Sequence, residues 1–168
     1  DLDERCVLLS NGYAPSESNH HFHAQMVYGV TNVVHASFRQ ALGRQVGWSF
    51  GGGGGAGRLR IVPFAGREEN AWYDPKLGTL NFGYFAAAAP TDRTPADGWV
   101  FTALSHDIVA HEMSHALLDG LRSSFAEASS NDMLGFHEGF ADLVALFHHF
   151  SHDDALRRAI EKSRGEIQ

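Results

Sequence analysis

The sequence predicts an α+β fold, in which a small mixed β-sheet packs beside one long helix and two later helices. Apolar residues recur at helical spacing in residues 22–42, and further runs of helical length cover residues 102–118 and 133–150. Short segments rich in β-branched and aromatic residues at 59–64 and 79–85 predict strands. The whole chain of 168 residues is expected to form one domain, because this length suffices for a single core.

The N-terminal part of the chain carries few signals. Residues 6–9 predict a short strand, and residues 11–19 predict a turn-rich connector. Three histidines follow, where the first long helix is expected to begin: His20, His21 and His23. We expect them to serve in capping and solvent contact, with metal binding as the minor alternative.

The helix predicted at residues 22–42 has an apolar stripe that is expected in the core, and it ends at Gly43. The stripe comprises Met26, Val30, Val33, Val34 and Phe38. Five consecutive glycines follow at 51–55. A phosphate-binding loop would need Gly-Lys-Ser/Thr next and then a helix, whereas a strand is predicted here, so we expect a flexible loop or hairpin.

The central motif is His-Glu-Met-Ser-His. His111 and His115 lie four residues apart in the helix predicted at 102–118, so both imidazoles lie on one face, and two neutral imidazoles suit zinc. Glu112 lies beside them, and a carboxylate there can take a proton from water whose pKa the metal has lowered. We therefore predict zinc ligation by the two histidines, with Glu112 as general base. Asp107, one turn earlier, either buttresses His111 or is an exposed first-turn acid that stabilises the helix dipole.

A tetrahedral zinc ion needs a third protein ligand. In one known arrangement the third ligand is a histidine six residues after the second motif histidine, with a glycine halfway between. That arrangement would need glycine at 118 and histidine at 121, and it is excluded because Leu118 and Leu121 stand there. The apolar run at 133–150 contains Glu138 and Asp142 on one helix face, where carboxylates are costly unless they are paired or bound to metal. We predict Glu138 as the third ligand and Asp142 as the acceptor for the second N–H of a zinc-bound histidine. An exposed helix charge is the alternative for Asp142.

Taken together, these residues resemble the gluzincin metallopeptidases, and more narrowly the thermolysin family: Asp107, His111, Glu112, His115, Glu138 and Asp142. The resemblance covers residues 22–150. It implies a zincin-like fold, in which the sheet packs with the long N-terminal helix and the motif helix, followed by the glutamate-bearing helix. It also implies one zinc ion per chain and attack of promoted water on a peptide carbonyl, with the motif glutamate as base.

The resemblance extends to the substrate. The segment Asn70-Ala71-Trp72-Tyr73, between the two predicted strands, is similar to the family's substrate-binding edge segment. It implies that the Asn70 side chain and the backbone around Ala71 hold a peptide or protein substrate. It further implies a secreted protein.

The sequence departs from the family at the groups that stabilise the oxyanion. Phe125 and Ala126 lie near the place of a family tyrosine, and the family's later histidine belongs to a following helical domain. We therefore expect a fragment that lacks this downstream domain and is weakly active alone, since one absent oxyanion donor costs about a hundred- to a thousandfold in rate. If the chain proves fully active, His137 and His149 are the first candidates for the donor. Calcium is not predicted, because His149 and His152 stand where acidic ligands are expected.

The connections are predicted from turn residues and caps. Residues 86–98 are expected to form a loop, and the motif helix is expected to end at Gly120. A polar connector should then lead to the next helix, with Asn131 or Asp132 as its cap. Residues 153–162 predict a charged amphipathic helix.

Composition narrows the function classes. The net charge is −7 and the 13 basic residues form no dense patch, which argues against a nucleic-acid partner. No apolar run has membrane-spanning length, and Cys6 stands alone, so neither an internal disulfide nor a cysteine-based zinc site is expected. Two functions remain: a zinc endopeptidase, or a degenerate zinc-binding module that binds peptides or partners without cutting them. The presence of Glu112 favours the peptidase, because a purely structural site needs no base.

Overall fold

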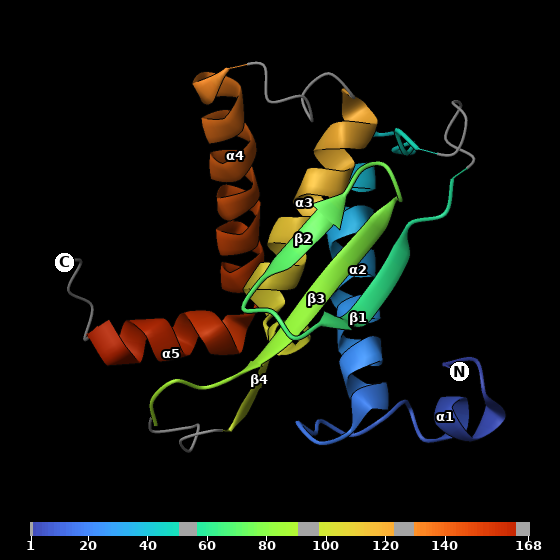
Figure 1. The fold of residues 1–168 in the computed structure, drawn as a ribbon, viewed down its shortest axis with the longest axis vertical. Helices are drawn as coiled ribbons and strands as arrows, with labels where there is room; N and C mark the ends of the chain where they lie inside the picture. The colour runs from blue at the N-terminus through green and yellow to red at the C-terminus, as the bar shows by residue number, and fades with distance from the viewer. Residues whose placement is uncertain (1, 51–56, 91–97, 123–129, 164–168) are drawn as a thin grey trace.

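The computed structural model describes residues 2–50, 57–90, 98–122 and 130–163 (Figure 1). Within these ranges the chain forms helices and a small mixed sheet, which confirms the α+β prediction. The helices are α1 (Arg5–Leu9), α2 (His20–Leu42), α3 (His106–Leu121), α4 (Asn131–Phe150) and α5 (Asp153–Ser163), with a 3-10 turn at Thr102–Leu104.

The sheet is built around one central strand. β3 (Thr79–Ala86) pairs in parallel with β1 (Arg60–Gly66) and antiparallel with β2 (Ala71–Asp74), giving the order β1-β3-β2. The last residues of β3 also pair antiparallel with β4 (Trp99–Phe101). The segment predicted between two strands is thus itself a strand, and β2 lies at an edge of the sheet, beside α3.

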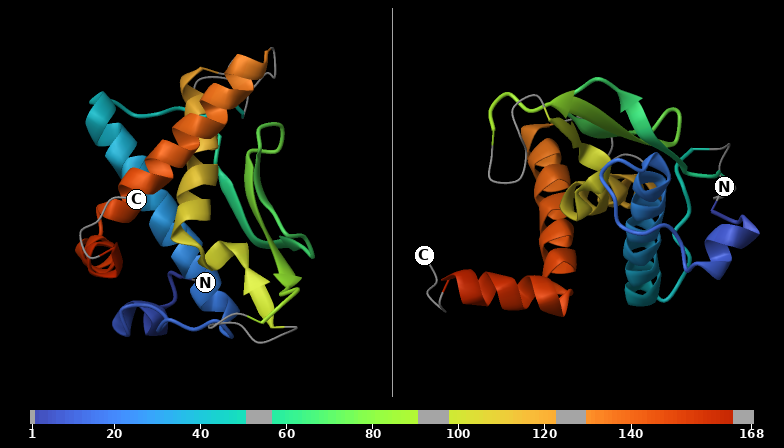
Figure 2. Two further views of the ribbon diagram at one scale, coloured as in Figure 1. Left: turned by 90° about the vertical axis from the view of Figure 1, so that its left-hand side faces the viewer. Right: turned by 90° about the horizontal axis from the view of Figure 1, so that it is seen from below.

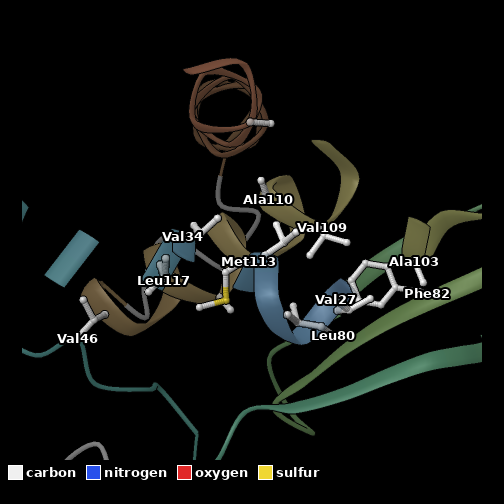
Figure 3. Packing of buried hydrophobic residues seen from close by; sticks show 13 residues of the cluster. Val27, Val34, Val46, Leu80, Phe82, Ala103, Val109, Ala110, Met113 and Leu117 are labelled. Carbon is white, nitrogen blue, oxygen red and sulfur yellow. The ribbon is translucent and has the colours of Figure 1, made fainter. Parts of the chain in front are cut away.

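The core lies between this sheet and the two long helices α2 and α3. Figure 2 shows α3 between α2 and α4, with the sheet covering α2 and α3. In Figure 3, Met113 and Leu117 of α3 pack with Val34 of α2 and with Leu80 and Phe82 of β3. All five side chains are at most 2% exposed, so α3 is held rigidly by apolar contacts.

Helix α2 begins and ends at capping residues. The side chain of Asn19 accepts a hydrogen bond from the His21 N–H. Gly43 ends the helix as predicted, with a left-handed φ of 65° that glycine adopts readily. Val33 does not belong to the core as predicted: it is 52% exposed, because the buried face is centred on Val27, Val30 and Val34. The prediction of solvent contact is wrong for His23, which is buried and whose Nε2 lies 2.8 Å from the Glu17 carbonyl oxygen.

The prediction of a strand at residues 6–9 is wrong, because this segment belongs to α1. Its backbone groups are satisfied locally, since the Leu8 N–H donates to the Glu4 carbonyl and the Ser10 N–H to the Cys6 carbonyl. Val7 is the buried residue of this helix. A short apolar segment fits a strand or a helix equally well, and its sequence does not show which backbone hydrogen bonds form.

The bounds predicted for α3 are wrong at both ends. Thr102 donates a side-chain hydrogen bond to the Gly83 carbonyl at 2.9 Å, which ties it to β3, and α3 begins only at His106. Ser105 is the N-cap and accepts from the Ile108 N–H. At the other end, Gly120 lies inside the helix, where it packs directly against the Gly47 carbonyl. Gly120 is therefore required for a close approach rather than for a helix end.

Helix α4 starts one or two residues earlier than predicted, with Ser130 as the cap in place of Asn131 or Asp132. The Ser130 side chain accepts a hydrogen bond from the Met133 N–H at 3.2 Å. The helix buries Ala141 and Ala145 but exposes several large apolar side chains: Leu134, Phe136, Leu143, Leu146, Phe147 and Phe150. Among the described residues, no helix is both long and apolar enough to cross a membrane.

Helix α5 confirms the amphipathic helix predicted at residues 153–162. Three other predictions fall wholly or mostly outside the described residues. These are the glycine run at 51–55, the loop at 86–98 and the oxyanion positions Phe125 and Ala126.

Candidate metal centre

Helix α3 presents the two motif histidines on one face. One helical turn separates His111 and His115, and their Nε2 atoms lie 3.0 Å apart. Both rings are only partly exposed, with side-chain exposures of 20% and 12%. The helix is fixed behind them by the core, so the two nitrogens are held at one point.

Helix α4 runs beside α3 and supplies the carboxylate that the sequence predicted. Glu138 Oε2 lies 3.3 Å from His111 Nε2, and Glu138 Oε1 lies 3.7 Å from His115 Nε2. One donor atom from each of the three side chains lies within 4.8 Å of the others. His111, His115 and Glu138 thus form a group that could hold a metal ion.

The second nitrogen of each motif histidine is also engaged. His111 Nδ1 lies 2.9 Å from Asp142 Oδ1, and His115 Nδ1 lies 2.6 Å from His137 Nδ1. If each motif histidine carries its proton on Nδ1, His111 donates to Asp142 and His115 donates to His137. The lone pairs of both Nε2 atoms then face the centre. Asp142 therefore contacts His111, but its side chain is 75% exposed, so it is also the exposed helix charge of the alternative prediction. The partnership of His137 with His115 was not predicted, although His137 directly precedes Glu138.

Glu112 faces the same centre from a buried position. Its side chain is buried, and burial raises the pKa of Glu112 to about 7, while His111 and a hydrogen bond from the Tyr73 backbone N–H act in the opposite direction. A carboxyl group with a pKa near neutrality can both accept and release a proton at physiological pH.

A cleft of about 440 Å³ opens over the candidate metal group. One wall is the segment from Asn70 to Tyr73, and the other walls carry the motif residues and Glu138. A neighbouring cleft of about 420 Å³ shares His111 and Glu112 and continues past Ala71 toward Asp142 and Asp107. The predicted substrate residues Asn70 and Ala71 therefore line both clefts.

A buried carboxylate fixes β2 to α3. Asp119 is 2% exposed and accepts hydrogen bonds from the Tyr73 hydroxyl at 2.7 Å and from the Ser49 hydroxyl. Burial raises the pKa of Tyr73 above its usual range, and the bond to Asp119 raises it further. Sequence analysis did not identify this group, because its three members are far apart along the chain.

Asp142 contacts the motif histidine His111, whereas Asp107 contacts two other histidines. Its carboxylate lies 2.9 Å from His149 Nδ1 and 3.5 Å from His106 Nδ1, at the first turn of α3. His149, one of the two histidines considered for the oxyanion, is engaged with Asp107, whereas His137 lines the first cleft.

Comparisons with protein-family models, curated proteins and solved structures found no match. The geometry of these side chains alone therefore carries the functional interpretation.

Proposed function

We propose that the protein is a zinc-dependent endopeptidase with a zincin-like catalytic fold. The observation that carries this proposal is the grouping of one donor atom from each of His111, His115 and Glu138 within 4.8 Å of one another. Zinc bonds of about 2.0–2.1 Å in a tetrahedron place ligand atoms about 3.3 Å apart. The two histidine Nε2 atoms, 3.0 Å apart, agree with one edge of such a tetrahedron. Glu138 brings one carboxylate oxygen to 3.3 Å from His111 Nε2 and the other to 3.7 Å from His115 Nε2.

The chemistry of the donors favours zinc over the common hard cations. Calcium and magnesium take oxygen ligands, whereas two of the three donors here are imidazole nitrogens. Three protein ligands leave one tetrahedral position for water, which is the pattern of catalytic rather than structural zinc. Asp142 and His137 support the site by orienting the two rings.

Glu112 would act as the general base. Bound zinc lowers the pKa of a water molecule and polarises a carbonyl oxygen. Glu112 would take one proton from the attacking water as the water oxygen bonds to the peptide carbonyl carbon. It would then give the proton to the amide nitrogen as the C–N bond breaks, which yields a carboxylic acid and an amine. Burial raises the pKa of Glu112, which makes it a better proton acceptor, and a bound cation would favour the ionised form that accepts the first proton.

The edge strand supports a peptide as the substrate. β2 pairs with β3 along one side and lies at the end of the order β1-β3-β2, next to the cleft. An extended peptide can add to such an edge through main-chain hydrogen bonds. Asn70 and Ala71 border both clefts, so they would contact residues on either side of the scissile bond.

The test is Glu112→Gln, assayed with a quenched fluorescent peptide together with the zinc content. We expect the zinc content to equal that of the wild type, while hydrolysis falls by about a hundred- to ten-thousandfold, the usual contribution of a general base. Glu161→Gln, on exposed α5, is the matched control and should leave both readouts unchanged.

Two results would count against the proposal. Zinc lost in Glu112→Gln would make Glu112 a ligand rather than a base. A wild-type protein that binds zinc and peptide but cleaves nothing would instead be the non-catalytic zinc-binding module.

A further inference from the structure

Four of the 11 histidines gather at a junction of helix ends, away from the proposed active site. His106 is the first residue of α3, His148 and His149 lie in the last turn of α4, and His152 directly precedes α5. None of them belongs to the group formed by the motif histidines and Glu138.

Two of these histidines already have the geometry of a chelating pair. His106 Nε2 and His152 Nε2 lie 3.2 Å apart, and the ring centroids lie 4.9 Å apart with the ring planes nearly perpendicular. Two imidazoles on one tetrahedral zinc, with bonds of about 2.0–2.1 Å, have nitrogens about 3.3 Å apart and centroids about 5 Å apart. Both distances agree with shared coordination of one ion.

His148 would supply the third nitrogen once its ring turns toward the pair, because in this structure the three histidines do not bring one nitrogen each within 4.8 Å of one another. Its ring centroid lies 6.1 Å from that of His106, about 1 Å more than coordination of the same ion requires. Its Nδ1 atom is buried and has no hydrogen-bond partner in the part of the chain that the structure describes. A buried nitrogen without a partner is costly, and a metal ion would satisfy it. A simple hydrogen bond between His106 and His152 leaves this nitrogen unexplained.

Asp107 orients the first of these rings and supplies negative charge. Its Oδ1 lies 3.5 Å from His106 Nδ1, which leaves His106 Nε2 as the nitrogen that faces His152. The same oxygen lies 2.9 Å from His149 Nδ1. A carboxylate behind a histidine is the usual support of a metal-bound imidazole. Burial lowers the pKa values of His106 and His148, which favours the neutral form that binds metal.

We propose that His106, His148 and His152 form a second metal site, which binds a nitrogen-preferring divalent ion such as zinc and joins the ends of α3, α4 and α5. Its role is structural. It crosslinks the last turn of α4 and the first residues before α5 to the rigid helix α3, and the negative end of the α4 dipole favours a cation there. Calcium and magnesium are excluded by the three nitrogen donors.

The test measures zinc per chain after equilibration at a buffered micromolar free zinc concentration, with the wild type and three variants. The wild type should hold two zinc ions. His115→Ala should retain the junction ion, His152→Ala should retain the active-site ion, and the double variant His115→Ala/His152→Ala should hold none. His152 is exposed and lies between two helices, so the fold should survive its removal, and circular dichroism checks this.

Two further measurements make the result specific. His21→Ala, another exposed histidine, is the matched control and should still bind two ions. In the His115→Ala background, added zinc should raise the melting temperature, and His152→Ala should abolish this rise. The proposal is overturned if His115→Ala holds no zinc, or if His152→Ala still holds two ions. Neither result bears on the proposed peptidase, which depends on the other histidine pair.

Discussion

His111 and His115 each direct one ring nitrogen toward the proposed zinc ion and the other toward a neighbouring side chain. The neighbours differ in chemistry, because His111 has the carboxylate of Asp142 and His115 has the imidazole of His137. A carboxylate acceptor raises the basicity of a bound imidazole more than a neutral acceptor does. The two ligands are therefore supported unequally.

Asp142→Ala should weaken zinc binding by about ten- to a hundredfold without removing the site, because an oriented ligand loses its acceptor. Competition with a zinc chelator of known affinity measures this change. Asp132→Ala is the matched control, since Asp132 is an exposed acid in the first turn of the same helix. An unchanged affinity in Asp142→Ala would make Asp142 an ordinary surface charge.

Tyr73→Phe should lower the free energy of unfolding at neutral pH by about 1–3 kcal/mol, because buried Asp119 loses one of its two hydroxyl donors. This loss should shrink as the pH rises above 10. The pKa of Tyr73 is raised in the folded chain, so above its ordinary value of 10.0 the unfolded chain binds fewer protons than the folded one. The stability of the wild type therefore falls with pH in that range through Tyr73, and that of the variant does not.

Urea titrations between neutral pH and pH 11 measure this difference. Tyr28→Phe, at a tyrosine that is 55% exposed, should match the wild type at every pH. A gap between wild type and Tyr73→Phe that stays constant above pH 10 would show that the Tyr73 hydroxyl is not protected by Asp119.

At the scale of elements, the position of α3 depends on a close contact with the loop before the sheet. A Cβ atom at Gly120 would fall on the Gly47 carbonyl oxygen, closer than any real Cβ contact. The same addition at Gly135 in α4 meets nothing within 4 Å. A larger residue is therefore expected to clash at Gly120 and to fit at Gly135.

Gly120→Ala should destabilise the protein by about 1–3 kcal/mol, because the helix must move away from the backbone at Gly47. Gly135→Ala should instead stabilise it by about 0.5–1 kcal/mol, since alanine favours a helix interior without a clash. Chemical denaturation midpoints of the two variants measure both effects. Equal effects of the two substitutions would mean that α3 does not pack closely on residue 47.

At the scale of the whole molecule, α4 is the least firmly packed of the long helices. It buries only Ala141 and Ala145 among its described residues, and its contacts with α3 include the proposed zinc ligand Glu138. Helices α2 and α3 and the strand β3 supply most of the apolar core, to which α4 adds Ala145. Zinc would therefore contribute more to the docking of α4 than to the core.

Removal of zinc by a chelator should lower the melting temperature by about 5–10 °C, since zinc at a hundred times its dissociation constant stabilises by about 2.7 kcal/mol. Hydrogen exchange should increase first in α4 and later in β3 and α3, because the core remains. Addition of excess zinc should restore both readouts. A uniform increase of exchange in all elements, or an unchanged melting temperature, would contradict this prediction.

Local spacing was sufficient for much of the fold and of the site. The helices α2, α4 and α5 and the strands β1 and β3 follow from periodicity and from caps such as Gly43, since helix and strand patterns depend on residues close in sequence. The grouping of His111 with His115 follows from one helical turn. Glu138 was predicted because a carboxylate in an apolar helix needs a partner. It lies close to both histidines, but its side chain is 64% exposed, so its role as a ligand stays a prediction.

Only the tertiary structure decided which side chains from distant segments meet. Asp119 bonds Tyr73 and Ser49, which are 46 and 70 residues away, and His152 meets His106 across 46 residues. The start of α3 depends in the same way on the bond from Thr102 to β3, and the place of Gly120 on the approach of Gly47. Periodicity shows which face of a helix is buried, but it does not show which partner covers that face. That choice depends on how the helices and the sheet pack, because the contacts that fix it form only when the core has assembled.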